Sequence, residues 1–143
     1  KRQLEDAAAG RPMSWVGGAG TVREAVFVPD AMHNAAELLR REEAYGRSWV
    51  FPGSGPVTAH RLAEIAGRHL GRLVKVRAAG PLMLKLVALF NKDLRAFMPM
   101  VPHYLGEMRY DPSRLKALLG DLKVTPYEEA VPATLDWIRS RNG

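Results

Sequence analysis

The hydrophobic positions of this 143-residue chain follow a strand period in some stretches and a helix period in others, which predicts an α/β fold that is mostly helical. Short apolar or alternating stretches predict strands at 14–16, 25–28, 48–51 and 74–77. Apolar residues three and four positions apart predict helices from Asp30 to about Glu43, from Thr58 to Gly71, from Pro81 to about Asn91, from Pro112 to Gly120, and from Thr125 onward. The pattern shows no repeat and no low-complexity linker.

The predicted helix ends carry capping signals. Asp30 and Thr58 are predicted N-caps, and Gly71 is a predicted C-terminal stop. Thr125 and Glu128 have the spacing of a capping box, in which each side chain satisfies the other residue's backbone amide. Asp111 is the predicted cap of the fourth helix. In the last helix the residues predicted to pack on the core are Val131, Leu135 and Ile138, with Trp137 beside them.

The helix at 81–91 is apolar nearly all round, which is typical of a buried helix. It is predicted to lie in the chain's own core or between this domain and another. The Met98–Pro102 segment is predicted to be an apolar loop, either at a cleft rim or as a core-filling connection. We predict that this helix, this loop or both are covered by another chain, which would give a homodimer. The apolar run contains Lys85 and is far shorter than the ~20 residues that span a bilayer, so no membrane partner is expected.

Five weak motifs stand in order along the chain. They are the segment Arg23–Asp30, the pair 49–53 and 56–58, the helix ending at Phe90–Asn91, the segment 111–120, and the segment 125–129 with Trp137. In this order they resemble the C-terminal substrate-binding part of the extended short-chain dehydrogenases/reductases, the NAD-dependent epimerase/dehydratase family. The resemblance implies the C-terminal region of a Rossmann-type enzyme, with 1–10 as the end of a linking helix and 11–143 as the substrate-binding domain.

The chemistry of that family has no counterpart in this sequence. Gly17–Gly20 fails the G-x-G-x-x-G pattern of a dinucleotide-binding turn because Arg23 stands where the last glycine belongs. The residues four beyond the four tyrosines are Trp49, Met108, Arg114 and Val131, so the family's Tyr-x-x-x-Lys is absent. We therefore expect this chain to hold no cofactor and no catalytic residue, and to be inactive alone.

The resemblance also implies what a parent enzyme would contain. Its partner for this chain would be the missing Rossmann half of the same protein, with NAD or NADP as cofactor. The parent would act on a small-molecule substrate by redox, epimerase or dehydratase chemistry.

Arg23 is the first candidate for substrate binding. In sugar-nucleotide epimerases of the family, an arginine so placed relative to the aspartate at position 30 reaches the substrate diphosphate. A guanidinium suits this role because it offers a rigid fork of donors to phosphate or carboxylate oxygens. The alternative is a surface arginine paired with Glu24 or Asp30.

His103 and Tyr104 are the other candidates. The family's sugar-nucleotide members carry Arg-Pro-x-Asp where this chain has Val101, Pro102, His103 and Tyr104. The loss of both charged residues favours a less anionic or more apolar substrate, whose carbonyl or hydroxyl His103 and Tyr104 would orient.

The net charge of +6 raises a different possibility, a basic nucleic-acid-binding domain. Basic and acidic residues are interspersed, as in Arg40–Glu43, so no nucleic acid is expected as a partner. A free-standing ligand-binding or protein-interaction module is the other alternative. The absence of cysteine fits a reducing cytoplasm, and the four histidines lack metal-ligand spacing, so no metal is predicted.

Overall fold

The computed structural model describes residues 2–107 and 109–142, and their side chains except those of residues 103, 104 and 142. The strands are β1 (Met13–Val16), β2 (Arg23–Glu24), β3 (Pro56–Val57) and β4 (Val76–Ala79). The helices are α1 (Arg2–Ala8), α2 (Val28–Leu38), α3 (Ala59–Leu70), α4 (Pro81–Ala88), α5 (Lys92–Phe97), α6 (Val101–Leu105), α7 (Ser113–Leu119) and α8 (Tyr127–Asn142). Two 3₁₀ turns are η1 (Glu42–Ala44) and η2 (Met98–Met100). The prediction of a mostly helical α/β fold with a few short strands is confirmed.

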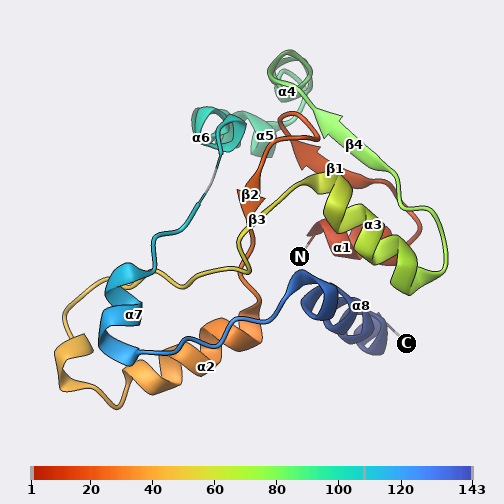
Figure 1. The fold of residues 1–143 in the computed structure, drawn as a ribbon. Helices are drawn as coiled ribbons and strands as arrows, with labels where there is room; N and C mark the ends of the chain where they lie inside the picture. Colours follow the sequence, from red (N-terminus) through yellow and green to blue (C-terminus); the bar gives the residue numbers. More distant parts are fainter. Residues whose placement is uncertain (1, 108, 143) are drawn as a thin grey trace.

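The core is built around β1 and β4, a parallel pair with Met13 opposite Val76 and Val16 opposite Ala79. Met13 and Trp15 are buried while Ser14 is exposed, as expected for alternate faces of a strand. Helices α1 and α3 pack beside the pair, and α8 packs on both helices (Figure 1). The inward positions predicted for α8 are buried, but Trp137 is 46% exposed beneath the Arg141 guanidinium.

Helix α3 has the predicted ends. The Arg61 amide donates to Thr58 Oγ1 at 3.2 Å, and Gly71 ends the helix with a φ of 66°. Leu62, Ile65 and Ala66 are buried. The next element is strand β4, so a strand follows the glycine as predicted, but it runs over Val76–Ala79 rather than 74–77.

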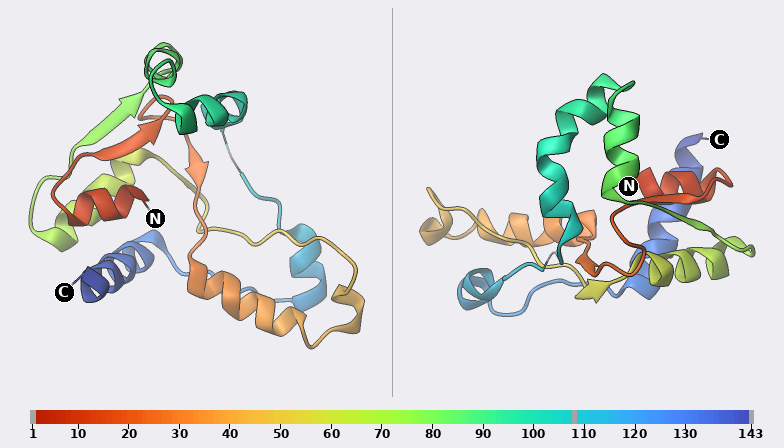
Figure 2. Two further views of the ribbon diagram at one scale, coloured as in Figure 1. Left: turned by 180° about the vertical axis from the view of Figure 1, so that it is seen from behind. Right: turned by 90° about the horizontal axis from the view of Figure 1, so that it is seen from above.

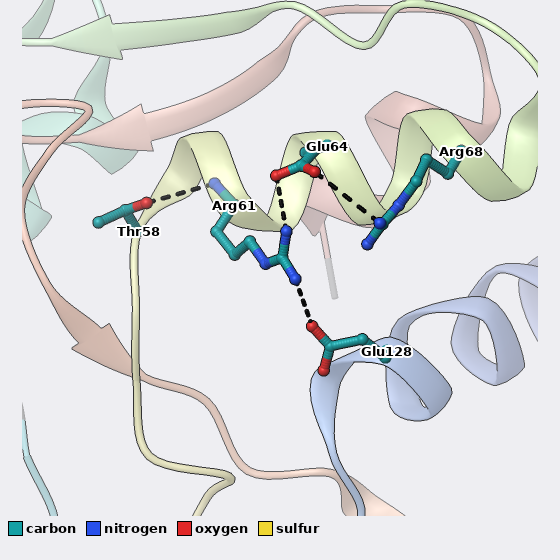
Figure 3. Close-up of polar contacts among 5 residues, drawn as sticks. All are labelled: Thr58, Arg61, Glu64, Arg68 and Glu128. Carbon is teal, nitrogen blue, oxygen red and sulfur yellow. Dashed lines mark hydrogen bonds and ion pairs between the residues drawn. The ribbon is translucent and has the colours of Figure 1, made fainter.

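Arg61 joins α3 to α8 (Figure 3). Its Nη1 donates to Glu64 at 2.8 Å and its Nη2 to Glu128 at 2.7 Å, while Arg68 lies 3.9 Å from Glu64. The capping box predicted at Thr125 and Glu128 is wrong, because the Glu128 carboxylate turns to Arg61. The hydrogen bond from Arg61 lowers the pKa of Glu64, and the pKa of Glu128 is lowered by its own backbone amide and then by Arg61.

This arrangement predicts a pH dependence of stability. Both glutamate pKa values are lower in the folded chain than the unfolded value of about 4.3, so the stabilisation is present above that pH and is lost as the pH falls through the folded pKa values. In Arg61→Ala, we expect the fall in melting temperature between about pH 5 and pH 3 to be shallower than in the wild type. An identical pH profile for the variant would contradict this role of Arg61. Arg40→Ala, which removes the exposed ion pair with Glu37 near the end of α2, is the matched control.

A second lobe contains α2, η1 and α7, at the end of the molecule opposite α4 (Figures 1 and 2). The antiparallel pair β2–β3, with Arg23 opposite Val57, leads to it from the core. Here the predicted boundaries need correction. The ladder of β2 ends at Glu24, so there is no strand at 25–28, and residues 48–51 form no strand either.

The helix predicted from Asp30 to about Glu43 is shorter and starts earlier. It begins at Val28, after the extended Phe27 and with Pro29 in its first turn, where the missing amide costs nothing. Arg41 is extended, with φ −115° and ψ 114°, so α2 cannot continue into η1. Helix α7 likewise begins at Ser113 rather than Pro112, although Asp111 still accepts the Ser113 amide at 3.0 Å.

Of the two placements predicted for the 81–91 helix, the one in the chain's own core is wrong, and the one against another domain or chain stays a prediction. Helix α4 buries only Leu84 and Ala88, while Leu82 is 73% exposed and Phe90, after its end, is 92% exposed. Figure 2 shows α4 and α5 side by side as a hairpin that stands away from the β1–β4 pair. The predicted Met98–Pro102 loop is instead η2 followed by α6, which tolerates Pro102 because it lies in the first turn.

Candidate functional site

Arg23 lies on β2 at the end of β1. Its side chain crosses to that strand, where Nη2 donates to the Val16 carbonyl oxygen and the guanidinium lies 4.7 Å from the centre of the Trp15 ring. This distance is that of a cation–π contact. The side chain is half-buried, and the stacking fixes its orientation. Arg23 is therefore a preorganised cation at the junction of the core and the second lobe.

Glu24, the next residue, fastens two loops to β2. Its Oε1 accepts the Gly53 amide at 2.8 Å, and its Oε2 accepts the Tyr110 amide at 2.9 Å. Both carboxylate oxygens are thus engaged by backbone donors from distant segments. Glu24 is a structural tie and not the ion-pair partner that the surface alternative gave to Arg23.

Tyr127 closes the junction from α8. Its hydroxyl accepts the Ala25 amide at 2.9 Å and donates to the Gly55 carbonyl oxygen at 2.8 Å. Burial raises the pKa of Tyr127, so the phenol stays protonated at neutral pH. A tyrosine that acts as a general base needs the opposite shift, and we therefore assign Tyr127 to positioning the loop at Gly55.

Asp30 and Asn34 hold the chain before α8. The Asp30 carboxylate, on a residue only 4% exposed, accepts the Thr125 amide at 2.5 Å and the Thr125 hydroxyl at 2.9 Å. The Asn34 side chain donates to the Lys123 carbonyl oxygen at 3.0 Å and accepts the Lys123 amide at 2.9 Å. Asp30 is thus neither the predicted N-cap of its helix nor available to a ligand.

The other two candidate residues lie outside the described side chains. His103 and Tyr104 belong to α6, whose backbone packs near β1, but the positions of their side chains are not described. Their role in substrate binding therefore stays a prediction. The structure brings α6 and the Arg23 strand junction to the same end of β1, which is the arrangement the prediction requires (Figure 1).

A hollow of about 640 Å³ lies elsewhere, between α3 and the segment 71–76. Arg68, Arg72 and Lys75 line it, but Arg72 donates to the carbonyl oxygens of Ala7 and Ala8 and so caps α1. The hollow is open and lacks Arg23. We give it less weight than the Arg23 junction because none of the site residues predicted from the sequence lines it.

Arg23 stays the candidate substrate contact predicted from the sequence. Its guanidinium donates to the Val16 carbonyl oxygen and stacks on Trp15. The neighbouring carboxylates of Glu24 and Asp30 and the hydroxyl of Tyr127 are likewise engaged in internal hydrogen bonds. No described group of three histidine, aspartate or glutamate side chains is placed to hold a metal ion. No described helix is long and apolar enough to cross a membrane.

Comparison with solved structures identifies the architecture. The chain superposes on UDP-glucuronic acid 4-epimerase from Bacillus cereus, solved with NAD, with a TM-score of 0.70 and 11% identity, over 99% of this chain and 39% of that one. It superposes on dTDP-glucose 4,6-dehydratase from Bacillus anthracis, also solved with NAD, with a TM-score of 0.65 and 14% identity, over 98% of this chain and 38% of that one. For UDP-glucose 4-epimerase from Thermus thermophilus, solved with NAD, the TM-score is 0.63 and the identity 19%, over 95% of this chain and 38% of that one.

The fold is that of the C-terminal portion of such epimerases. The resemblance predicted from the sequence is thereby confirmed at the level of the fold. The chain spans well under half the length of these solved enzymes, which leaves their remaining part without a counterpart here. No family model and no curated protein matches the sequence itself.

Proposed function

We propose that this chain is the substrate-binding C-terminal part of an NAD(P)-dependent epimerase/dehydratase or reductase, and that it is inactive by itself. One observation carries the proposal. Almost the whole chain superposes on a part of an epimerase solved with NAD, and that part is 39% of the epimerase's length. The sequence of this chain contains neither a dinucleotide-binding turn nor a Tyr-x-x-x-Lys pair. The cofactor would be held by the other half of the parent protein.

The orientation of α2 supports a missing partner domain. Its buried residues are Asp30, Asn34 and Leu38, while the apolar Met32 and Leu39 are 60% and 69% exposed. A helix whose apolar stripe faces outward is typical of a helix that packs against a further layer. The apolar segment 48–51, which has strand composition but forms no strand, lies in the same lobe. We infer that the cofactor-binding half packs on this lobe.

The substrate that we propose is less anionic than a nucleotide sugar. Arg23 is one fixed cation, and the neighbouring α6 carries Val101 and Tyr104 where the sugar-nucleotide members carry the charged residues of Arg-Pro-x-Asp. A single guanidinium suits one carboxylate or one polarised oxygen.

Substitution of Arg23 in the longer parent protein tests this role. Arg23→Ala is expected to raise the KM for substrate about tenfold, equivalent to roughly 1.4 kcal/mol of binding, with a smaller change in kcat. Arg23→Lys keeps the charge without the bidentate fork and should be intermediate. Arg77→Ala, on the exposed face of β4, is the matched control.

Melting temperatures separate a folding defect from a binding defect in these variants. A parent enzyme with an unchanged KM in Arg23→Ala would remove Arg23 from the site. A parent that shows no NAD(P)-dependent turnover would overturn the proposed function as a whole.

A further inference from the structure

The hairpin formed by α4 and α5 presents a continuous apolar surface. At 3.6 residues per turn, the exposed large apolar residues of α4 and its C-cap occupy one arc of about 160°, opposite the buried Leu84 and Ala88. These residues are Leu82, Met83, Leu86, Val87 and Leu89. Phe90 extends the arc at the tip of the hairpin, where it is 92% exposed. Isolated exposed apolar residues are ordinary, but a contiguous set of this kind marks an interaction surface.

Several backbone groups near the tip are hydrogen-bonded within the hairpin. Asn91 accepts the Leu94 amide at 2.9 Å and so caps α5. Arg95 donates to the carbonyl oxygens of Ala88 and Leu89, at 3.2 and 2.8 Å, and so caps α4. Backbone groups that are already bonded lower the cost of placing the tip in an apolar medium.

The charge around this apolar surface has one sign. Between residues 77 and 97 the basic residues are Arg77, Lys85, Lys92 and Arg95, and the one acidic residue is Asp93. This excess of +3 is half of the net charge of the whole chain. Other exposed surfaces are mixed, such as η1 with Glu42 and Glu43 after Arg40 and Arg41. An apolar wedge with a basic collar is complementary to an anionic lipid surface.

We propose that the α4–α5 hairpin docks on the surface of a membrane that contains anionic lipid, with Phe90 and the outer face of α4 in the headgroup region. The hairpin lies at the end of the molecule opposite α2, so the proposal does not depend on the cofactor-binding half that we place at α2 (Figure 1). The sequence argues against a membrane partner only because the apolar run around Lys85 is too short to span a bilayer. An interfacial hairpin of this kind lies on the bilayer without crossing it.

A second copy of the chain fits this surface less well. A stable dimer buries about 800 Å² on each partner, and an eight-residue helix is only about 12 Å long. A symmetric pairing of α4 would also bring Lys85 near its own copy, and lysine is depleted from protein interfaces.

Vesicle co-sedimentation of the 143-residue chain tests the proposal. The chain is expected to sediment with vesicles of phosphatidylcholine and phosphatidylglycerol, and much less with phosphatidylcholine alone. Phe90→Ser should lower the affinity about tenfold or more, because burial of a phenylalanine is worth about 1.5–3 kcal/mol. The double variant Lys85→Gln with Lys92→Gln should lower binding to the anionic vesicles by about thirtyfold, at roughly 1 kcal/mol for each lysine.

Control variants, a test of folding and the oligomeric state complete the experiment. Leu39→Ser and Leu73→Ser remove residues that are 69% and 85% exposed away from the hairpin, and they should bind like the wild type. All these positions are exposed, so the variants should fold, and circular dichroism checks this. No sedimentation with anionic vesicles, or sedimentation that Phe90→Ser leaves unchanged, would overturn the proposal. A dimer in analytical ultracentrifugation that Phe90→Ser dissolves, without lipid binding, would assign the surface to a second copy instead.

Discussion

Replacement of Asp30 by alanine is expected to lower the free energy of unfolding by about 3 kcal/mol. The buried carboxylate accepts both the amide and the hydroxyl of Thr125, and hydrogen bonds to charged groups are the stronger ones. In the variant the amide and the hydroxyl of the half-buried Thr125 would both lose their partner. The segment that leads into α8 would then be held by Asn34 and by the Ser54 hydroxyl, which donates to the Thr125 carbonyl oxygen.

Urea unfolding followed by circular dichroism measures this effect. Glu37→Ala is the matched control on the same helix, because Glu37 pairs only with the exposed Arg40, and its cost should stay within about 0.5 kcal/mol. Equal stabilities of the Asp30 and Glu37 variants would mean that the contact between α2 and Thr125 contributes nothing to the fold.

Gly53→Ala is expected to cost a similar amount, about 3 kcal/mol, for a steric reason. A Cβ at Gly53 would collide with the carbonyl group of Ala25 and would lie 2.7 Å from Cγ of Glu24. Backbone atoms cannot turn aside as a flexible side chain can. The substitution should therefore also weaken the hydrogen bond from the Gly53 amide to Glu24.

Gly80→Ala is the control for this prediction. Gly80 has a negative φ of −72°, and a Cβ there would meet nothing within 4 Å, so the variant should be as stable as the wild type. Thermal unfolding of the two variants side by side gives the comparison. If the Gly53→Ala variant had the same melting temperature as the wild type, the loop at Gly53 would be free to move away from β2.

The elements that the sequence predicts well are those fixed by local spacing. Helix α3 has its predicted cap, apolar face and glycine stop, because each depends on residues within four positions of one another. The inward face of α8 is predicted for the same reason, since Val131, Leu135 and Ile138 follow one helical stripe.

The features that sequence reasoning missed depend on contacts between distant segments. The prediction of a capping box at Thr125 is wrong because the Thr125 hydroxyl donates to the carboxylate of Asp30, 95 positions away. The tie from Tyr127 to Ala25 spans 102 positions and has no local signal. The stacking of Arg23 on Trp15 brings together β2 and β1, two strands that belong to different sheets, and spacing alone does not reveal it.

The apolar helices show a different limit. The composition of α4 and the stripe of α2 both indicate that these surfaces need a partner, but not which one. Within the chain, α4 has its outer face in solvent and α2 presents a polar face inward. The sequence therefore predicts that the apolar faces of α2 and α4 need a partner surface, but it does not predict whether that surface lies inside this domain.

Calorimetric titration with NAD and NADP tests the central claim most directly. It compares the 143-residue chain with a longer protein made from the same gene with its upstream coding sequence. We expect no saturable binding to the chain and saturable binding to the longer protein, because the phosphate-binding turn would lie in the added half. Saturable binding to the chain alone, or a longer protein that binds neither cofactor, would contradict the account of this chain as a substrate-binding part.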